Sequence, residues 1–419
     1  MKTGTATIEI TPQPGAELSG YVARVQPSTA VRDALYARGL YLDDGTARIL
    51  WLHADLIGLE REFVADVKGA LQERYGLAPE QVVLSATHTH AGPATIHLNL
   101  CGEYDAPYVG WLRERLLETA AAAMRHVEET EPVTAEGHCA LAVDRRGGPS
   151  AHVDHRMGVI AWRRPDASYA AVLANYAMHN VVLSSDNRLI SGDAAGRAAR
   201  TIHLGLPGAP VVLFTNGACG NTNPPRHTSD FSQLDAWGDE LADSVIRALA
   251  SAAPVPNAAL RTARAHFDLP LDVGDEARIK AWAAKLRAGT KNAAGYAPER
   301  VRRAADLWEA EMLGRLAAGT IPDHIRMDLG VIRIGPVAWV CVGAEVFSRI
   351  ADDLRAAAGQ PLYVVGYANG DVGYLPERAA YTEGGYEVDS AFIFYHGFRP
   401  KPGAFEMLRD TAMELMRQI

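Results

Sequence analysis

Apolar residues recur along this chain with two spacings, and segments of the two kinds alternate. Short runs of β-branched and aliphatic residues over 47–55 and 82–86 predict buried strands. Between them, apolar residues three and four positions apart over 60–75 predict an amphipathic helix. The same criteria predict strands over 133–143, 157–162, 169–178 and 210–215, and helices over 105–129, 192–204 and 229–250.

One segment of the second half has a different character. Residues 274–319 are rich in Ala, Arg, Lys and Glu and predict two charged helices, broken near 289–298. Because no Pro/Ser/Gly-rich stretch flanks this segment, we interpret it as a helical excursion and not as a linker. Around it, the pattern predicts strands over 260–271, 326–334, 337–342 and 362–366, and helices over 346–358 and 403–418. The predicted fold is therefore α/β, a single large domain over 1–419 with mixed β-sheets covered by helices.

Composition and charge narrow the class of protein. The 419 residues are 48% hydrophobic and 22% charged, as in ordinary globular proteins. The net charge of −9 argues against a nucleic-acid binder, because such proteins need a basic face. The longest apolar stretches, such as 334–344, have about half of the roughly 20 residues that span a bilayer. We expect no transmembrane segment.

The N-terminus and the cysteines indicate the compartment. The first ten residues alternate like a strand and lack the apolar core of a signal peptide. The four cysteines are widely scattered and form no CxxC pair. We therefore expect a cytoplasmic protein with reduced thiols.

Histidines at strand ends are the first candidates for chemistry. The segment Thr87-His88-Thr89-His90 follows the strand predicted over 82–86. Residues i and i+2 of a strand point to one face, so the two imidazoles would converge, one to bind a metal and the other to transfer protons. Alternatively, one histidine donates to the turn backbone and the other is solvated. His179 ends a second apolar strand in the same way.

Three further positions are candidates, and for two of them a structural and a chemical interpretation both stay open. Asp193 lies at a strand-to-helix turn and suits a cap for a helix starting at Gly196. Cys219 lies in the Gly/Asn-rich loop 214–225, whose N–H groups can aim at an oxyanion; it is a nucleophile or, since no partner is evident, a packed thiol. Glu345 follows the strand at 337–342 and is either a charge at a helix N-terminus or a metal ligand.

An ordered set of short motifs resembles the neutral/alkaline (non-lysosomal) ceramidase family. The resemblance covers the catalytic domain over nearly the whole chain, and the order and spacing of the motifs are specific together. The motifs are Gly20-Tyr21, Thr87-His88-Thr89-His90-Ala91-Gly92-Pro93, Asp144-Arg145, His179-Asn180, Ser191-Gly192-Asp193, Gly220-Asn221-Thr222-Asn223-Pro224, Gly343-Ala344-Glu345, and Gly366-Tyr367-Ala368-Asn369 through Gly373-Tyr374 to Tyr386-Glu387.

The resemblance implies a zinc-dependent site that hydrolyses an N-acyl amide, with one Zn²⁺ per chain. It implies that His90 handles protons, that Arg145 stabilises an anion and that Tyr386 lies near the reacting carbonyl. The zinc ligands that it implies are His88, His179, Glu345 and Tyr374.

Two departures from the family pattern bear on the substrate. Asn223 stands where the family has a catalytic serine before proline, and Asn221 stands at the aspartate position. An asparagine is no nucleophile, although its amide can orient a substrate carbonyl. We also expect no immunoglobulin-like C-terminal domain of the kind that full-length ceramidases have, and we expect segment 274–319 to shape the pocket. The expected substrate is thus a small or lipid-like N-acyl compound, with ceramide itself an open question.

We therefore expect a zinc amidohydrolase in which water attacks directly. Two alternatives stay open: an esterase or lactonase on the same zinc, since the electrostatic demands are similar, and a non-catalytic metal- or ligand-binding protein with this fold. The sequence is compatible with a homo-oligomer.

Overall fold

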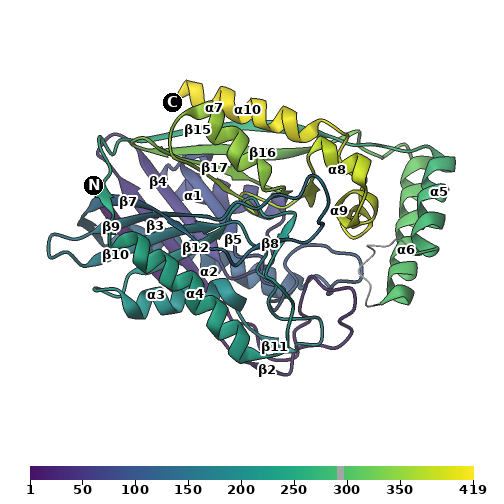
Figure 1. Ribbon diagram of the computed structural model, residues 1–419, viewed down its shortest axis with the longest axis horizontal. Coiled ribbons are helices and arrows are strands. Elements are labelled where there is room, and N and C mark those ends of the chain that lie inside the picture. The colour runs from purple at the N-terminus through teal and green to yellow at the C-terminus, as the bar shows by residue number, and fades with distance from the viewer. Residues whose placement is uncertain (290–296) are drawn as a thin grey trace.

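The computed structural model describes residues 1–289 and 297–419, and its strands form three main sheets (Figure 1). In the described residues the first sheet has the order β5-β4-β3-β1-β6, the second β12-β10-β9-β7-β14 and the third β15-β16-β17-β19. The bounds are β1 Lys2–Glu9, β3 Tyr36–Asp43, β4 Arg48–Ala54, β5 Val82–Ala86, β6 Val127–Glu129, β7 Glu131–His138, β9 Arg156–Arg163, β10 Tyr169–Tyr176, β12 Val211–Asn216, β14 Ala253–Pro254, β15 Leu260–Pro270, β16 His324–Ile334, β17 Val337–Val342 and β19 Leu362–Val365.

Each main sheet contains one parallel pair of strands, and these pairs position the site. The pairs are β4 with β5, β10 with β12, and β17 with β19. The segments that follow the carboxyl ends of parallel strands gather at one edge of such sheets, where α/β proteins place their ligands. In this chain those segments contain His88 and His90 (the HxH motif), His179, the Gly/Asn-rich residues that follow β12 up to Pro225 (the Gly220 loop), Glu345, and the tyrosine-containing residues 366–387.

Helices cover the outer faces of the sheets. α1 (Arg61–Tyr75) and α2 (Ala106–Arg125) share an apolar cluster with the first sheet. α3 (Asp193–Gly205) and α4 (Phe231–Leu249) pack on the second, and α7 (Arg349–Ala358) and α10 (Ala404–Gln418) cover the third along the top of Figure 1. A separate buried cluster draws residues from all three sheets, including Trp51, Trp162 and Trp339. The three main sheets therefore share this cluster as a common core.

The excursion predicted over 274–319 consists of α5 (Glu276–Arg287) and α6 (Pro298–Ala317), inserted between β15 and β16. They form a separate pair at the right of Figure 1, but they are firmly packed. Trp308 is fully buried against Phe392 and Phe398, and Arg300 donates to the Leu100 carbonyl at 2.9 Å. Of the predicted break, residues 290–296 lie outside the described residues.

Short elements complete the chain around the site. Paired two-residue strands join β2 (Ala30–Val31) to β11 (Leu189–Ile190), β8 (Val143–Asp144) to β13 (Thr222–Asn223), and β18 (Glu345–Val346) to β20 (Tyr374–Leu375). The remaining short helices are η1 Pro79–Gln81, α8 Arg378–Glu383, α9 Tyr386–Asp389 and η2 Ala391–Ile393.

Most predicted elements are present, and the differences have structural reasons. The helix predicted over 105–129 ends at Arg125, because Val127–Glu129 pair with β1 as β6. The helix predicted over 346–358 begins at Arg349, because β18 precedes it. The strand predicted over 133–143 is divided into β7 and β8, and β3 was not predicted.

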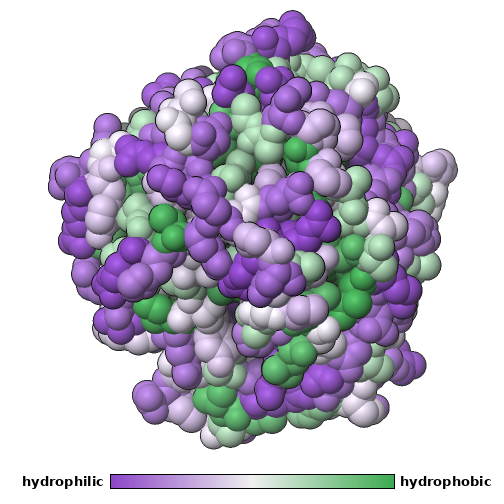
Figure 2. All heavy atoms as spheres, turned by 90° about the vertical axis from the view of Figure 1, so that its left-hand side faces the viewer, coloured by the Kyte–Doolittle hydropathy of each residue, from purple (hydrophilic) through white to green (hydrophobic). Residues whose placement is uncertain are grey.

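No helix of the described residues is long and apolar enough to cross a bilayer. The face drawn in Figure 2 shows apolar residues in small groups separated by polar ones.

Candidate metal centre and its cavity

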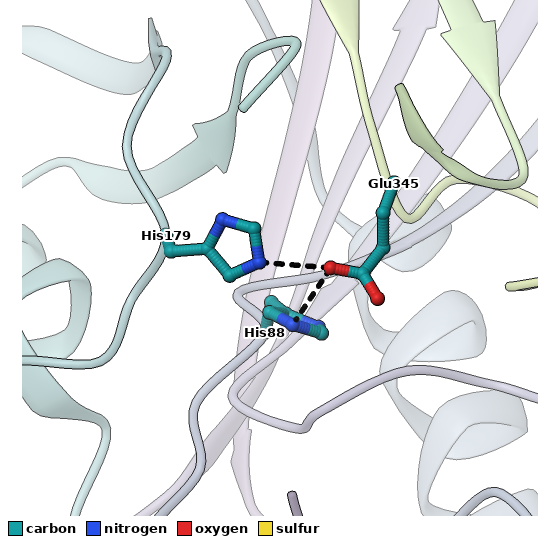
Figure 3. A group of neighbouring side chains, drawn as sticks. All are labelled: His88, His179 and Glu345. Atoms are coloured by element: carbon teal, nitrogen blue, oxygen red, sulfur yellow. Dashed lines mark hydrogen bonds and ion pairs between the residues drawn. The ribbon is translucent and has the colours of Figure 1, made fainter. Parts of the chain in front are cut away.

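Three buried side chains from different sheets meet at one point. His88 follows β5, His179 follows β10 and Glu345 opens β18. Glu345 Oε2 lies 2.8 Å from His179 Nε2 and 3.5 Å from His88 Nε2 (Figure 3). One ligand atom from each residue lies within 4.8 Å of the others, and all three residues are at most 2% exposed. This spacing suits donors around a single metal ion.

The outer nitrogens of both histidines fix which ring atom faces the centre. His88 Nδ1 lies 2.7 Å from the Ile57 carbonyl oxygen, and His179 Nδ1 lies 2.6 Å from that of Cys219. A carbonyl only accepts, so each Nδ1 carries the proton and donates it. In the neutral ring Nε2 then bears a lone pair, which in both residues faces the Glu345 carboxylate. The two Nε2 lone pairs and the carboxylate repel one another at these distances, and a cation between them would turn the repulsion into attraction.

Electrostatics favour the protonation states that metal ligands need. Burial lowers the pKa of His88 to about 4, which keeps its imidazole neutral. Burial alone would raise the pKa of Glu345, but positive charge on His88 and His179 lowers it to about 2. With both imidazoles neutral, a bound cation would supply that positive charge. Neutral imidazole and ionised carboxylate are the forms that bind metal. Two nitrogens and one oxygen fit a borderline ion such as zinc.

Tyrosines complete the surroundings of the cluster. Glu345 and Tyr374 are register partners in the parallel β18–β20 pair, and the Tyr374 hydroxyl lies 3.4 Å from His179 Nε2. The Tyr367 hydroxyl lies 3.3 Å from Glu345 Oε2, and its ring stacks on His88 with centroids 3.9 Å apart. Tyr395 donates to the other carboxylate oxygen of Glu345. Sequence reasoning named Tyr374 but assigned no role to Tyr367 or Tyr395.

The HxH motif converges for a reason other than the one predicted. β5 ends at Ala86, so His88 and His90 do not share a strand face. The chain turns at His88, whose φ of 57° is left-handed, and Tyr367 opposite it has a φ of 52°. Such residues cost about 1–3 kcal/mol each and are typical of functional sites. His90 Nε2 lies 3.1 Å from His88 Nε2, yet His90 is not a member of the three-residue group.

The predicted catalytic residues line one cavity of about 700 Å³. His90, Arg145, Asn223 and Tyr386 are in its wall, together with His179 and Tyr374 of the cluster region. The cavity therefore gathers predicted catalytic residues that are up to 296 positions apart, from His90 to Tyr386.

Two neighbouring contacts hold His90 in the cavity wall. Arg24 Nη1 donates to the His90 carbonyl at 2.6 Å. Gly20 lies against the His90 ring so closely that a Cβ there would be 2.3 Å from Nδ1. The segment 20–24 thus fixes the position of this histidine.

Arg145 is a partly buried cation, and each of its three guanidinium nitrogens makes one contact with the cavity wall. Its Nε donates to Glu387 at 2.8 Å, Nη1 donates to Asn223 Oδ1 at 3.1 Å and Nη2 donates to the Gly220 carbonyl at 2.8 Å. Its guanidinium carbon also lies 5.3 Å from the centre of the Tyr374 ring. Arg145 therefore organises the cavity wall as well as supplying positive charge to it.

The Gly220 loop is joined closely to Glu345. Gly220 N donates to the Val346 carbonyl at 2.8 Å, and a Cβ at Gly220 would lie 2.3 Å from the Glu345 carbonyl oxygen. Cys219 beside it is a packed thiol: burial raises its pKa to about 12, and its Sγ lies 3.4 Å from the Tyr367 hydroxyl. Asn221 is structural, because its amide joins Asp144 to the backbone of Ser348.

Asp193 does not cap a helix from Gly196, because α3 begins at Asp193 itself. Its carboxylate accepts from the backbone N–H groups of Val182, Leu183 and Ala194. It thereby secures the segment after His179.

His227 also lines the cavity, and sequence reasoning missed it. It lies three residues after the motif that ends at Pro224, and no local pattern marks it.

Comparison with known proteins confirms the resemblance. Residues 2–144 match the family model described as neutral/alkaline non-lysosomal ceramidase, N-terminal. Neutral ceramidase A of Dictyostelium discoideum is 25% identical over 221 residues, which are 47% of this chain and 31% of that protein. The match thus spans under a third of that relative's length.

Two solved structures share the fold over all of this chain and 75% of theirs. One is described as a ceramidase complexed with C2, with a TM-score of 0.78 and 16% identity. The other is the neutral ceramidase of Pseudomonas aeruginosa, with a TM-score of 0.75 and 17% identity. The predicted α/β fold class is confirmed by these structures.

Proposed function

We propose that this protein is a metal-dependent amidohydrolase that uses one zinc ion to cleave an N-acyl amide bond of a small or lipid-like substrate. One observation carries the proposal. Two imidazole lone pairs and a carboxylate converge in a buried cluster, and His179 of that cluster lines the cavity that also holds His90, Arg145 and Asn223. The similarity to ceramidases supports an amide as the bond attacked.

His88, His179 and Glu345 would hold the ion, with Tyr374 as a fourth, weaker donor. Zinc, when bound, supplies the Lewis acidity that makes a water nucleophilic near neutral pH and polarises a carbonyl. Both imidazoles donate from Nδ1 to backbone carbonyls, and these hydrogen bonds hold the rings in this orientation. The ligands therefore need no conformational rearrangement to bind the ion.

His90 would protonate the leaving amine. Its Nε2 points toward the cluster, and burial among His88, His179 and Arg24 holds its pKa well below the ordinary value. A neutral His90 can take a proton from the attacking water and pass it to the amine nitrogen. Amines leave only when protonated, whereas alkoxides leave more readily.

Asn223 and Arg145 would stabilise charge that develops on the carbonyl oxygen, and Tyr386 would lie near that carbonyl. Asn223 carries N–H donors that favour an oxyanion in a dry cavity. Since an asparagine cannot form an acyl-enzyme, water attacks the carbonyl directly.

The test compares matched amides and esters. The protein is assayed with N-acyl amides of increasing chain length, ceramide included, and with esters of the same acyl groups, before and after chelation and zinc addition. We expect turnover of amides that chelation abolishes and zinc restores. His90→Ala should slow amide cleavage much more than ester cleavage. Faster turnover of esters with equal dependence on His90 would favour an esterase, and no turnover of either would favour a binding protein.

A further inference from the structure

His227 contacts the residue that replaces the family's serine. Its Nε2 lies 3.3 Å from Asn223 Nδ2, and its Nδ1 lies 2.6 Å from the Val181 carbonyl oxygen. Both His227 and Asn223 line the cavity beside His90, and the Tyr21 ring packs edge-on against the rings of both histidines. His227 therefore lines the cavity wall with one side, although the residue as a whole is exposed.

The hydrogen atoms along this chain of contacts can be assigned without ambiguity. Arg145 only donates, so the atom of Asn223 that it contacts is the amide oxygen. The amide nitrogen of Asn223 therefore faces His227. The Val181 carbonyl only accepts, so His227 Nδ1 carries the proton and Nε2 is the acceptor for the Asn223 amide.

This arrangement fixes the plane of the Asn223 amide from both ends. Arg145 holds the oxygen, and Arg145 is itself held by Glu387. His227 holds one N–H. An amide nitrogen has two N–H bonds, and no contact within residues 1–289 and 297–419 uses the second one.

We propose that His227 is a positioning residue: through its Nε2 it orients the Asn223 amide so that the second N–H of Asn223 donates to the carbonyl oxygen of the substrate. This inference rests on the proposed amide hydrolysis. In this role His227 neither transfers a proton nor contacts the reacting atoms.

The imidazole is not needed to hold its own loop. The backbone around His227 is fixed by Thr228, whose N–H donates to Val182 at 2.7 Å and whose carbonyl accepts from Ser184 at 3.0 Å. A side-chain replacement at His227 should therefore leave the loop in place and change only the orientation of the Asn223 side-chain amide.

The first arm of the test is independent of activity. Histidine labelled with ¹⁵N in the full zinc-loaded chain shows the tautomer of each ring by NMR, and the loss of one signal in His227→Gln assigns His227. We expect a neutral ring protonated on Nδ1. Protonation on Nε2 would overturn the proposal, because that nitrogen could not accept from Asn223.

The second arm is a double-mutant cycle with N-butyryl aminomethylcoumarin as probe. His227→Leu should lower kcat by about 10- to 100-fold with little change in KM, the range expected for a donor that is present but misdirected. Adding His227→Leu to Asn223→Ala should cause no further loss, because His227 acts through Asn223. His227→Gln, which keeps an acceptor, should recover part of kcat.

A matched control is His203→Leu on α3, whose Nδ1 also contacts a backbone carbonyl, that of Pro210, but which does not line the cavity. It should leave kcat unchanged. Additive losses in the cycle, or a full-rate His227→Leu, would overturn the proposal. If the unmodified protein hydrolyses no amide while His227 is protonated on Nδ1, the proposed function fails and the hydrogen-bond assignment stands.

Discussion

Substitution of Gly220 by alanine should disturb the metal centre without touching any ligand side chain. The new Cβ would lie 2.3 Å from the carbonyl oxygen of Glu345. Gly220 is not in the left-handed region, so its backbone angles suit alanine and the effect is purely steric. The hydrogen bond from Gly220 N to Val346 O holds the two segments together, so relief of the clash must move one of them.

The size of the effect follows from that distance. A Cβ needs at least 3.0 Å from a backbone oxygen, so the gap must open from 2.3 Å by about 0.7 Å or more. Overpacking of this kind costs about 1–3 kcal/mol of folding free energy. Because Glu345 Oε2 is only 2.8 Å from His179 Nε2, a shift of its backbone also disturbs the donor set. Loss of ligand support typically weakens metal binding by about 10- to 100-fold.

The assay is competition for zinc against a chromogenic chelator, combined with denaturant unfolding of the chelated protein. Gly110→Ala on α2 is the control, because nothing lies within 4 Å of its Cβ position. That change should raise stability by about 0.5–1 kcal/mol and leave zinc affinity unchanged. If Gly220→Ala binds zinc as tightly as the unmodified protein, Glu345 is not held by this loop and the reasoning is wrong.

Three other changes have separable outcomes. Cys219→Ala should keep most activity, measured as kcat, because the thiol is packed with a pKa near 12; a loss above about 1000-fold would indicate a nucleophile. Lys68→Met should raise the free energy of unfolding at pH 7 by about 1–3 kcal/mol, since Asp328 keeps Arg264 as partner. Burial lowers the pKa of Lys68 to about 8, so its ammonium costs stability below pH 8 and this cost fades as pH rises toward 10.5; a constant difference across that window in urea titrations would contradict this cause. Tyr374→Phe should retain zinc, by metal analysis, but lower kcat by about 10-fold or more; full loss of zinc would make Tyr374 a primary ligand.

The sequence predicts what depends on local spacing. The strand at 82–86 and the helix at 60–75 show their periodicity within one segment, and both are present within a residue of the predicted bounds. β3 escaped prediction because Arg38 interrupts its apolar pattern. That arginine is buried against Asp55 at 2.8 Å, a partner that the pattern of β3 cannot show.

The sequence motifs predicted part of the candidate site. His88, His179 and Glu345 lie just after strands and were brought together by family resemblance, and the structure places them in one cluster. Tyr395 and His227 had no local signal. Their roles arise from contacts with Glu345 and Asn223, which depend on how distant loops meet.

The most direct test of the central claim is the zinc content of two variants purified in parallel with the unmodified protein. After zinc loading and dialysis, the unmodified protein and His90→Ala should each retain one zinc per chain, while His88→Ala should retain none, because it loses a primary nitrogen donor. His90→Ala should nevertheless lose amide turnover. Zinc retained by His88→Ala and lost from His90→Ala would reverse the two roles, and zinc content unchanged in both variants would contradict the metal centre itself.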